Sequence, residues 1–245
     1  MKSSEKIKYI SNWIKTYAEQ MPSKAQSLVI GISGGIDSSV SSTLSAMTGI
    51  KTIVLTMPIR QKDNQHDLSL KHQKWLVEKF KNTEAHTINL DELFKSFSST
   101  LNKFDNEHGF ANSRARLRMT TLYQVAAANK GIVVGTGNKV EDFGVGFYTK
   151  YGDGGVDISP IADCNKTEVW ELGKELGILK EIINAQPTDG LWDDGRTDEG
   201  QLGFKYEDLE DAMKNPNSPH RQEYEKIRKQ NLHKMEPIPV CKIPS

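Results

Sequence analysis

The stretch SLVIGISGGIDSS, residues 27–39, joins a short apolar run to a loop with two adjacent glycines. Its first six residues predict a buried strand, and the hydrophobic pattern that restarts near Ser38 predicts a helix. Gly34 and Gly35 can adopt backbone angles that other residues avoid, and they let the main chain approach a ligand closely. The start of the helix adds free N–H groups and the positive end of its dipole. We therefore predict a phosphate-binding turn between the first strand and the next helix.

The polar side chains of this turn indicate how a phosphate would be held. Ser33, Ser38 and Ser39 supply hydroxyl donors, whereas Asp37 would repel a bare phosphate and therefore points to a bridging Mg²⁺. A Walker A loop and a dinucleotide-binding fingerprint are excluded, because neither GxxxxGK followed by Ser or Thr nor GxGxxG occurs in this position. The alternative is a purely structural turn, with serine and aspartate acting as helix caps.

Strand and helix patterns alternate on either side of this turn. The expected helices cover residues 7–21, 38–47, 67–81 and 113–129, and the expected strands cover residues 27–32, 51–57, 84–90 and 131–136. Asp91 is predicted to cap a further helix. This alternation predicts an α/β fold with a doubly wound, mostly parallel sheet and helices on both faces. We expect residues 1–245 to form a single domain.

Two regions interrupt the alternation. Residues 137–165 show no convincing helix or strand pattern, and residues 188–203 are rich in Asp and Gly. Loops longer than about 12–15 residues are uncommon in compact domains unless they are functional or disordered. We expect residues 150–157 and 188–203 to be mobile without ligand and ordered when substrates bind. A solvated linker is the alternative for the acidic region.

Composition excludes several classes of protein. The 245 residues carry 32 basic and 32 acidic side chains, and this balance gives no basic footprint for nucleic acid. Cys164 and Cys241 lie too far apart for a CxxC motif, which fits a reducing compartment. No apolar run approaches the ~18 residues of a membrane helix, and the N-terminus lacks a signal-peptide pattern. We expect a cytoplasmic protein with no nucleic-acid or membrane partner.

The SGGIDSS segment resembles the pyrophosphate loop of the ATP pyrophosphatases, which cleave ATP to AMP and pyrophosphate. Six further segments narrow the resemblance: VVGTGNKVE, FYTKYGDGGVDISPIAD, NKTEVWELGKELGI, QPTDGLWDD, DEGQLGFKYEDLED and LHK. Together they resemble ammonia-dependent NAD synthetases over residues 31–234, and TKYGDGGVD is the most specific block. The resemblance implies an adenine nucleotide α-hydrolase-like fold, a homodimer, and ATP-dependent amidation of deamido-NAD through an acyl-adenylate.

The resemblance also implies roles for individual residues. Asp37 and Glu141 would hold Mg²⁺, and Lys166 would stabilise charge on the ATP phosphates as the α-phosphate is attacked. The residues expected to bind ATP are Gly31, Ile32, Ser33, Gly34, Gly35, Ile36, Asp37, Ser38, Ser39, Thr136, Lys166 and Thr188. Those expected to bind deamido-NAD are Arg116, Lys150, Asp157, His233 and Lys234.

The implied reaction has two steps, adenylation of the nicotinate carboxylate and displacement of AMP by ammonia. Ammonia is mainly ammonium at neutral pH, so a nearby carboxylate would bind the cation and accept its proton. Asp153 in YGDGG is our candidate for this catalytic role, and a turn residue before two glycines is its alternative role. The synthetase segment fills almost all of the 245 residues, so we expect free ammonia, or a separate donor subunit, rather than a fused glutamine amidase to supply the nitrogen.

The sequence departs from the common family pattern in two places. Residues 141–150 are one residue longer than the common form, which leaves open whether Phe143, Phe147 or Tyr148 stacks on the nicotinate ring. The segment MPIRQKDNQ differs in sequence from the corresponding segment of the family pattern, so a role for Arg60 in binding ATP also stays open.

Two other functions compete with this interpretation. One is another ATP pyrophosphatase, such as a GMP synthetase subunit or a tRNA-modifying enzyme; the paired cysteines typical of tRNA thiolases are missing. The other is a nucleotide-binding module that has lost its chemistry, against which the presence of both Asp37 and Glu141 argues.

Overall fold

Four parallel strands form the central sheet of the structure, a computed structural model that describes residues 1–59, 63–188 and 197–244. The strands are β1 (Ser27–Gly31), β2 (Lys51–Thr56), β3 (Thr83–Thr87) and β4 (Gly131–Val133), in the spatial order β3-β2-β1-β4. Val29 in β1 lies opposite Ile53 in β2 and Val133 in β4. β1 and β2 are almost wholly buried, as expected for parallel strands covered on both faces. The predicted parallel sheet is confirmed.

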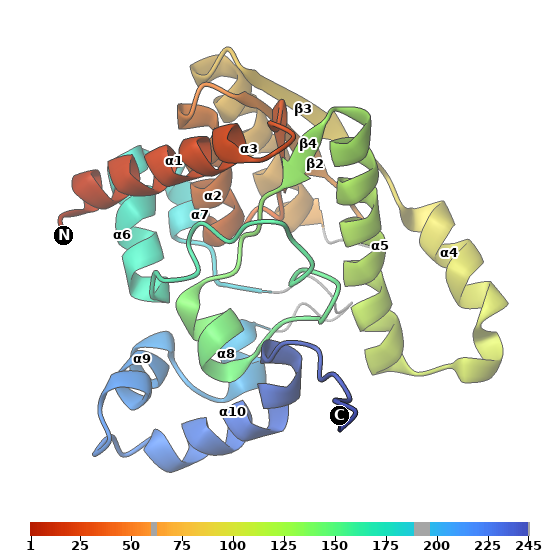
Figure 1. Ribbon diagram of the computed structural model, residues 1–245, viewed down its shortest axis with the longest axis vertical. Coiled ribbons are helices and arrows are strands. Elements are labelled where there is room, and N and C mark those ends of the chain that lie inside the picture. Colours follow the sequence, from red (N-terminus) through yellow and green to blue (C-terminus); the bar gives the residue numbers. More distant parts are fainter. Residues whose placement is uncertain (60–62, 189–196, 245) are drawn as a thin grey trace.

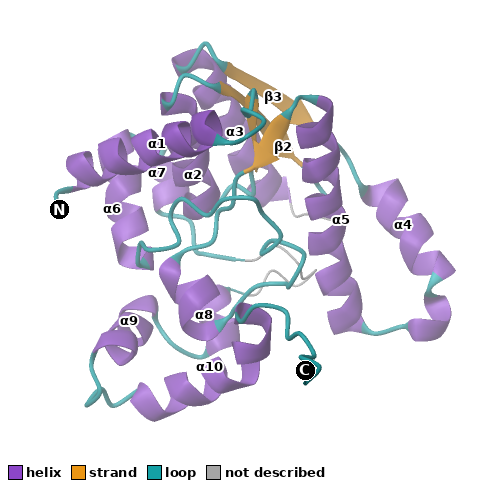
Figure 2. Ribbon diagram, viewed as in Figure 1, coloured by secondary structure: helices purple, strands orange, loops and turns teal. Residues whose placement is uncertain are grey.

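Helices cover both faces of this sheet (Figure 1, Figure 2). One face carries α1 (Ser3–Gln20), α2 (Ile36–Met47), α3 (Asp63–Lys79), α6 (Lys166–Leu176) and α7 (Lys180–Ile183), and the other carries α4 (Asp91–Thr100) and α5 (Glu107–Ala128). Successive side chains of β1 point to opposite faces of the sheet. Leu28 and Ile30 pack in the core beneath the first group of helices, whereas Val29 packs in the core beneath the second. The doubly wound arrangement is therefore confirmed as well.

A separate hydrophobic cluster lies towards the C-terminus. It packs η2 (Lys139–Val145) against α9 (Tyr206–Lys214) and α10 (Arg221–Met235), and its buried members include Val140, Tyr206, Leu209 and Tyr224. We call η2, α9 and α10 the C-terminal unit. A short helix, α8 (Asp198–Leu202), precedes α9. Figure 1 shows α9 and α10 at the end of the molecule farthest from α3.

Residues 137–165 are more regular than their sequence predicts. They contain the π-helix η2, and Val134 and Ile158 form a parallel bridge at the end of β4. The expectation of an irregular region is wrong here, because the π-helix is held by packing on α9 and α10 rather than by a periodic apolar face of its own.

One further detail differs from expectation. Asp91 is the first residue of α4 rather than its cap, because the side chain of Asn89 accepts the hydrogen bond from the Asp91 backbone N–H. The polar C-terminal stretch is helical through Met235, with the hydroxyl of Tyr148 donating to the Lys234 carbonyl at 2.6 Å. Among the described residues, no helix has the length and apolar character needed to cross a membrane.

Candidate active site

The glycine loop after β1 is held largely by its own side chains. Gly34 has a φ of 92°, in the left-handed region that favours glycine. The hydroxyl of Ser38 accepts a hydrogen bond from the Ser33 backbone N–H at 3.2 Å, and it donates to the Gly35 carbonyl at 3.1 Å. Ser39 also donates to the Gly35 carbonyl, at 2.9 Å. These bonds leave the amino end of α2 pointing its backbone N–H groups towards the end of β1, as a phosphate site requires.

Three charged side chains from distant parts of the chain meet beside this loop. Lys166, the first residue of α6, places its Nζ 2.5 Å from Oδ2 of Asp37 and 2.9 Å from Oε1 of Glu141. Asp37 lies in the first turn of α2, and Glu141 lies in η2. The Lys166 side chain is only 2% exposed. One buried cation thus sits between two carboxylates, and the structure brings together three residues that the sequence assigns to the metal and phosphate site.

Burial and mutual charge set the protonation of this group. Burial raises the pKa of Asp37, with help from the charge of Glu141, although Lys166 opposes the rise. Burial also works against ionised Glu141, but Lys166 and a hydrogen bond from Tyr206 outweigh it and lower its pKa. The pKa of Lys166 is raised, because the two carboxylates outweigh the effect of its own burial. Glu141 and Lys166 are therefore charged at neutral pH.

Asn138 joins the two carboxylate-bearing segments. Its side-chain oxygen accepts from the backbone N–H groups of Val140 and Glu141, at 3.0 and 3.1 Å, and so caps η2. Its side-chain nitrogen donates to Oδ1 of Asp37 at 3.1 Å. Asn138 is fully buried, so this single amide fixes Glu141 relative to Asp37.

A cavity of about 570 Å³ opens beside these groups. The sequence-predicted residues that line it are residues 31–38, Thr136, Glu141, Asp153, Lys166 and Thr188. Ser39 does not line it, because its side chain is buried and bonded to the Gly35 carbonyl. The cavity therefore lies at the carboxyl end of β1 and β4, where open α/β sheets place their ligands.

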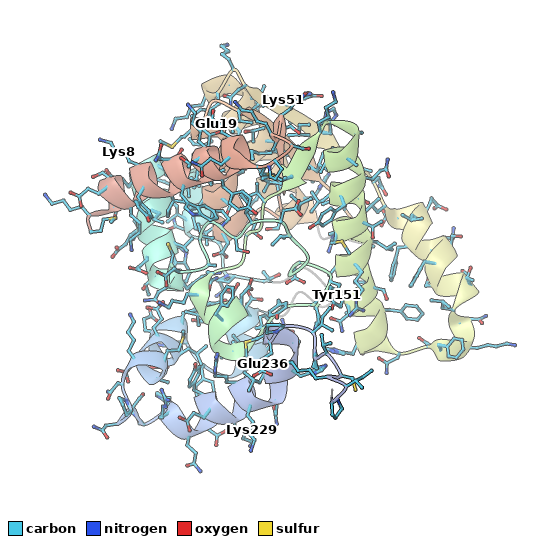
Figure 3. All side chains as sticks on the ribbon, in the orientation of Figure 1. Lys8, Glu19, Lys51, Tyr151, Lys229 and Glu236 are labelled. Atoms are coloured by element: carbon cyan, nitrogen blue, oxygen red, sulfur yellow. The ribbon has the colours of Figure 1, made fainter. Side chains whose placement is uncertain are left out.

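The residues predicted to bind deamido-NAD fall into two groups. Arg116 donates to the Lys150 carbonyl at 3.3 Å, and Lys150 Nζ reaches the His233 carbonyl at 3.4 Å. Lys234, next in α10, donates to the Tyr148 carbonyl at 2.7 Å. These cationic side chains therefore lie together, and Figure 3 shows the neighbouring Tyr151 near α5 and the end of α10.

Asp157 lies apart from that group. Its carboxylate accepts from the Val133 backbone N–H at 2.7 Å and from the Tyr123 hydroxyl at 3.1 Å. The structure thus gives Asp157 a role in tying residues 150–157 to the end of β4.

Two carboxylates besides Glu141 line the cavity on the side of η2. Asp153 accepts a hydrogen bond from the Thr149 backbone N–H at 2.9 Å, which matches the turn role weighed for it, while it also borders the cavity. Asp142 was not singled out from the sequence. Its pKa is raised well above the usual range by burial first, and then by the charges of Asp153, Glu141 and Asp37.

Other cavity residues were also missed by sequence reasoning. Arg118 lines the cavity and donates to the Met57 carbonyl at 3.0 Å, and its spacing with Ala115 and Leu122 on one face of α5 could have revealed it. Of the three aromatic candidates for the nicotinate ring, Phe147 lines the cavity, whereas Phe143 does not and is 50% exposed. Arg60 and residues 189–196 of the acidic region lie outside the described residues, whereas Asp198–Leu202 at its end form α8.

The donor set fits a hard divalent cation shared with a ligand. The two carboxylates already converge on one positive charge, as their distances to Lys166 show. Within the part of the chain that the structure describes, no cluster of three or more His, Cys, Asp or Glu side chains is placed to hold a metal by itself. Mg²⁺ typically takes one or two carboxylates and completes its shell with phosphate oxygens and water. Asp37 and Glu141 match that pattern.

Comparison with known proteins identifies the family. Residues 6–243 match the family described as NAD synthase. The NH(3)-dependent NAD(+) synthetase of Carboxydothermus hydrogenoformans is 38% identical over 212 residues, covering 84% of this chain and 83% of the relative. That of Finegoldia magna is 37% identical over 227 residues, covering 92% of this chain and 90% of the relative.

Solved structures agree with this assignment. NMN synthetase from Francisella tularensis has a TM-score of 0.91 at 30% identity, covering 99% of this chain and 100% of that one. NH3-dependent NAD synthetase from Campylobacter jejuni subsp. jejuni has a TM-score of 0.79 at 23% identity and shares the fold. The chain with the Asp37, Glu141 and Lys166 cluster beside its glycine loop thus belongs to the NAD synthase family, whose known reaction is the ATP-dependent amidation of deamido-NAD.

Proposed function

We propose that the 570 Å³ cavity binds ATP beside the nicotinate carboxylate of deamido-NAD, and that Asp37, Glu141 and Lys166 carry the adenylation step. The convergence of two carboxylates on one buried ammonium, at the amino end of α2, supports this most directly. A phosphate-binding turn alone would fit many nucleotide-binding proteins. Two carboxylates that can hold a metal ion, with a lysine beside them at the turn, fit an enzyme that transfers the adenylate group of ATP.

Mg²⁺ forms part of this proposal. Asp37 and Glu141 would hold it, and when bound it would neutralise charge on the phosphate oxygens of ATP. The chain's own groups do the remaining work. The N–H groups at the start of α2 bind the pyrophosphate that leaves, and Lys166 stabilises charge on the α-phosphate.

The carboxylate substrate would enter from the side of η2 and α5. We propose that Phe147 stacks on the nicotinate ring, because it is the aromatic residue among the three candidates that borders the cavity. Asp153 borders the same space and would accept a proton from ammonium, which leaves ammonia free to attack the acyl-adenylate and displace AMP. The cationic group of Arg116, Lys150 and Lys234 would contact the charged remainder of the dinucleotide.

The decisive experiment supplies purified protein with ATP, Mg²⁺, ammonium and deamido-NAD, and identifies the products by mass spectrometry. The proposal requires NAD⁺, AMP and pyrophosphate in equal amounts. Formation of ADP and phosphate instead would overturn the adenylate route. Glutamine in place of ammonium should yield no NAD⁺, and efficient use of glutamine by the single chain would contradict the proposed nitrogen source.

A second candidate substrate is the mononucleotide, nicotinate mononucleotide. The observation that favours it is the TM-score of 0.91 with a structure described as an NMN synthetase, against 0.79 with a described NAD synthetase. Both substrates present the same nicotinate carboxylate, so the adenylation chemistry would not change. Equimolar competition between the two, followed by separation of NAD⁺ and NMN, gives the ratio of their kcat/KM values directly.

We further propose that the protein acts in the cytoplasm as a homodimer. The balanced charge and the separated cysteines fit a cytoplasmic location, and the family resemblance supports a homodimer. Light scattering across a dilution series would report the oligomeric state.

A further inference from the structure

Tyr206 contacts the charged cluster from the C-terminal unit, outside the sheet. It is the first residue of α9, and its side chain is fully buried. The ring packs edge-on against Trp170 of α6, with centroids 5.9 Å apart and planes at 84°. Val140, Leu209 and Tyr224 belong to the same hydrophobic cluster. Packing on all sides therefore fixes where the phenol hydroxyl points.

That hydroxyl donates to Oε1 of Glu141 at 2.5 Å. A second carboxylate oxygen, Oδ2 of Asp198, lies at the longer distance of 3.4 Å. Hydrogen bonds from a neutral donor to a carboxylate are short and strong, so the bond to Glu141 dominates. The two residues are 65 positions apart in the chain.

The same ring also faces Lys166. The ammonium lies 4.9 Å from the centroid of the Tyr206 ring and 5.9 Å from that of Trp170. Both Lys166 and Tyr206 donate to the same oxygen, Oε1, of Glu141. The second oxygen, Oε2, takes neither of these two bonds. Tyr206 thus restricts the rotation of the Glu141 carboxylate through Oε1. Oε2 is left without a bond to either Lys166 or Tyr206.

We propose that Tyr206 is a positioning residue that orients Glu141 towards the metal and holds Lys166 beside it. The inference rests on the proposed function, because it assigns Tyr206 a role through a carboxylate that would hold Mg²⁺. Groups that orient metal ligands typically change metal affinity by about 10–100-fold when removed. A residue that only filled the core would not act on metal affinity in this way.

The chain offers a matched pair of variants. Tyr206→Phe removes the hydroxyl and keeps the ring that packs on Trp170. Tyr224→Phe makes the same change in the same cluster, at a tyrosine that is 6% exposed and has no hydrogen bond to Glu141 within the described residues. Thermal unfolding of both variants shows that each is folded before any binding is compared.

Binding of a non-hydrolysable ATP analogue is then titrated with Mg²⁺ by calorimetry, without the second substrate. Tyr206→Phe should need about tenfold more Mg²⁺ for half-saturation, whereas Tyr224→Phe should match the wild type. In turnover assays, kcat of Tyr206→Phe should return towards the wild-type value at high Mg²⁺. An unchanged Mg²⁺ midpoint, or an equal shift in Tyr224→Phe, would overturn the positioning role.

A double-mutant cycle separates this inference from the proposed function. If Tyr206 acts through Glu141, Tyr206→Phe should have no further effect on the Mg²⁺ midpoint in a Glu141→Gln background. An additional tenfold shift in that background would overturn the inference while leaving Glu141 as a metal ligand. A wild-type midpoint for Glu141→Gln alone would instead overturn the metal assignment in the proposed function, and the inference with it.

Discussion

The glycine loop and the C-terminal unit contribute to the same cavity by different routes. The loop is fixed by bonds between near neighbours, such as the Ser33 N–H and the Ser38 hydroxyl, five positions apart. Glu141 of the C-terminal unit is fixed by Tyr206, 65 positions away, and by Lys166, 25 positions away. Local bonds can be inferred from a short segment of sequence, whereas distant ones depend on the whole fold. The contrast shows why one half of the site was easier to predict than the other.

The largest expected effect tests whether the two regions contribute equally. Asp37→Asn and Glu141→Gln each remove one charge at nearly constant volume, one from each region. Each should lower kcat/KM about a thousandfold, equivalent to roughly 4 kcal/mol of transition-state stabilisation, if both hold the cation. Steady-state kinetics at fixed Mg²⁺ measures this.

Asp163→Asn is the matched control for these two variants. Asp163 has a 96% exposed side chain that pairs with Lys139 at the surface, so the activity of Asp163→Asn should stay at the wild-type level. A near-normal rate for either site variant would remove that residue from the metal site and break the symmetry between the regions.

The next effect concerns pH and the helix behind the glycine loop. His72 is fully buried, and burial lowers its pKa to about 4. Ser42 donates to the Ser39 carbonyl, so it accepts from Nε2 of His72 at 3.0 Å, and the buried Nδ1 has no partner among the described residues. The folded protein therefore holds His72 neutral.

Unfolding releases this constraint, since an exposed histidine has a pKa of about 6.5. Between the two pKa values, the unfolded chain binds a proton at His72 that the folded protein does not. The contribution of His72 to the free energy of unfolding is therefore full above about pH 6.5, and about 3 kcal/mol of it is lost as the pH falls towards 4. Urea unfolding across this range should show the loss in the wild type and a flatter profile in His72→Gln. A flat wild-type profile would refute the prediction.

A smaller effect tests the packing of the C-terminal unit. Gly146 ends η2 with a φ of +69°, and a Cβ added there would lie 2.7 Å from Cβ of Asn231 in α10. Gly177 ends α6 with a similar φ of +73°, but nothing lies within 4 Å of the added atom. Gly177→Ala measures backbone strain alone, about 1 kcal/mol, whereas Gly146→Ala should destabilise by about 2 kcal/mol or more. An equal loss of unfolding free energy in the two variants would show that α10 moves away from the added Cβ at no cost.

The fold itself followed from the alternation of apolar runs and helical spacing. Buried strands such as β1 and β2 are continuous apolar stretches, and the phosphate turn carries its glycines and serines in nine consecutive residues. The π-helix could not be predicted in this way, because seven residues give no clear period and their stability comes from α9 and α10.

The site followed the same division. Asp37, Glu141 and Lys166 could be named from motifs, but their meeting point depends on the sheet and on η2 together. Tyr206 lay within a recognised segment, yet nothing in that segment marks the side chain as pointing at Glu141. Whether Lys150, Asp153 and the rest of residues 150–157 gain order with substrates stays a prediction, which hydrogen exchange with and without ATP and deamido-NAD would test.

The smallest effect concerns the contact between α6 and the C-terminal unit. Thr167 of α6 gives both its backbone N–H and its hydroxyl to the carboxylate of Glu210 in α9, at 2.9 and 2.7 Å. Thr167→Ala removes one of these two bonds, and the remaining one keeps the buried carboxylate partnered. We therefore expect a loss of only about 1 kcal/mol in unfolding free energy.

The same variant should leave catalysis alone. Lys166 precedes Thr167 and is anchored by its own bonds to Asp37 and Glu141, so the cation site does not depend on the Glu210 contact. Urea unfolding and the Mg²⁺ dependence of turnover, measured on one preparation, test the two halves of this expectation. A shift in the Mg²⁺ midpoint with only a small loss of stability would show that the joint between α6 and α9 sets the geometry of the site, and that the C-terminal unit controls the metal through more than Tyr206.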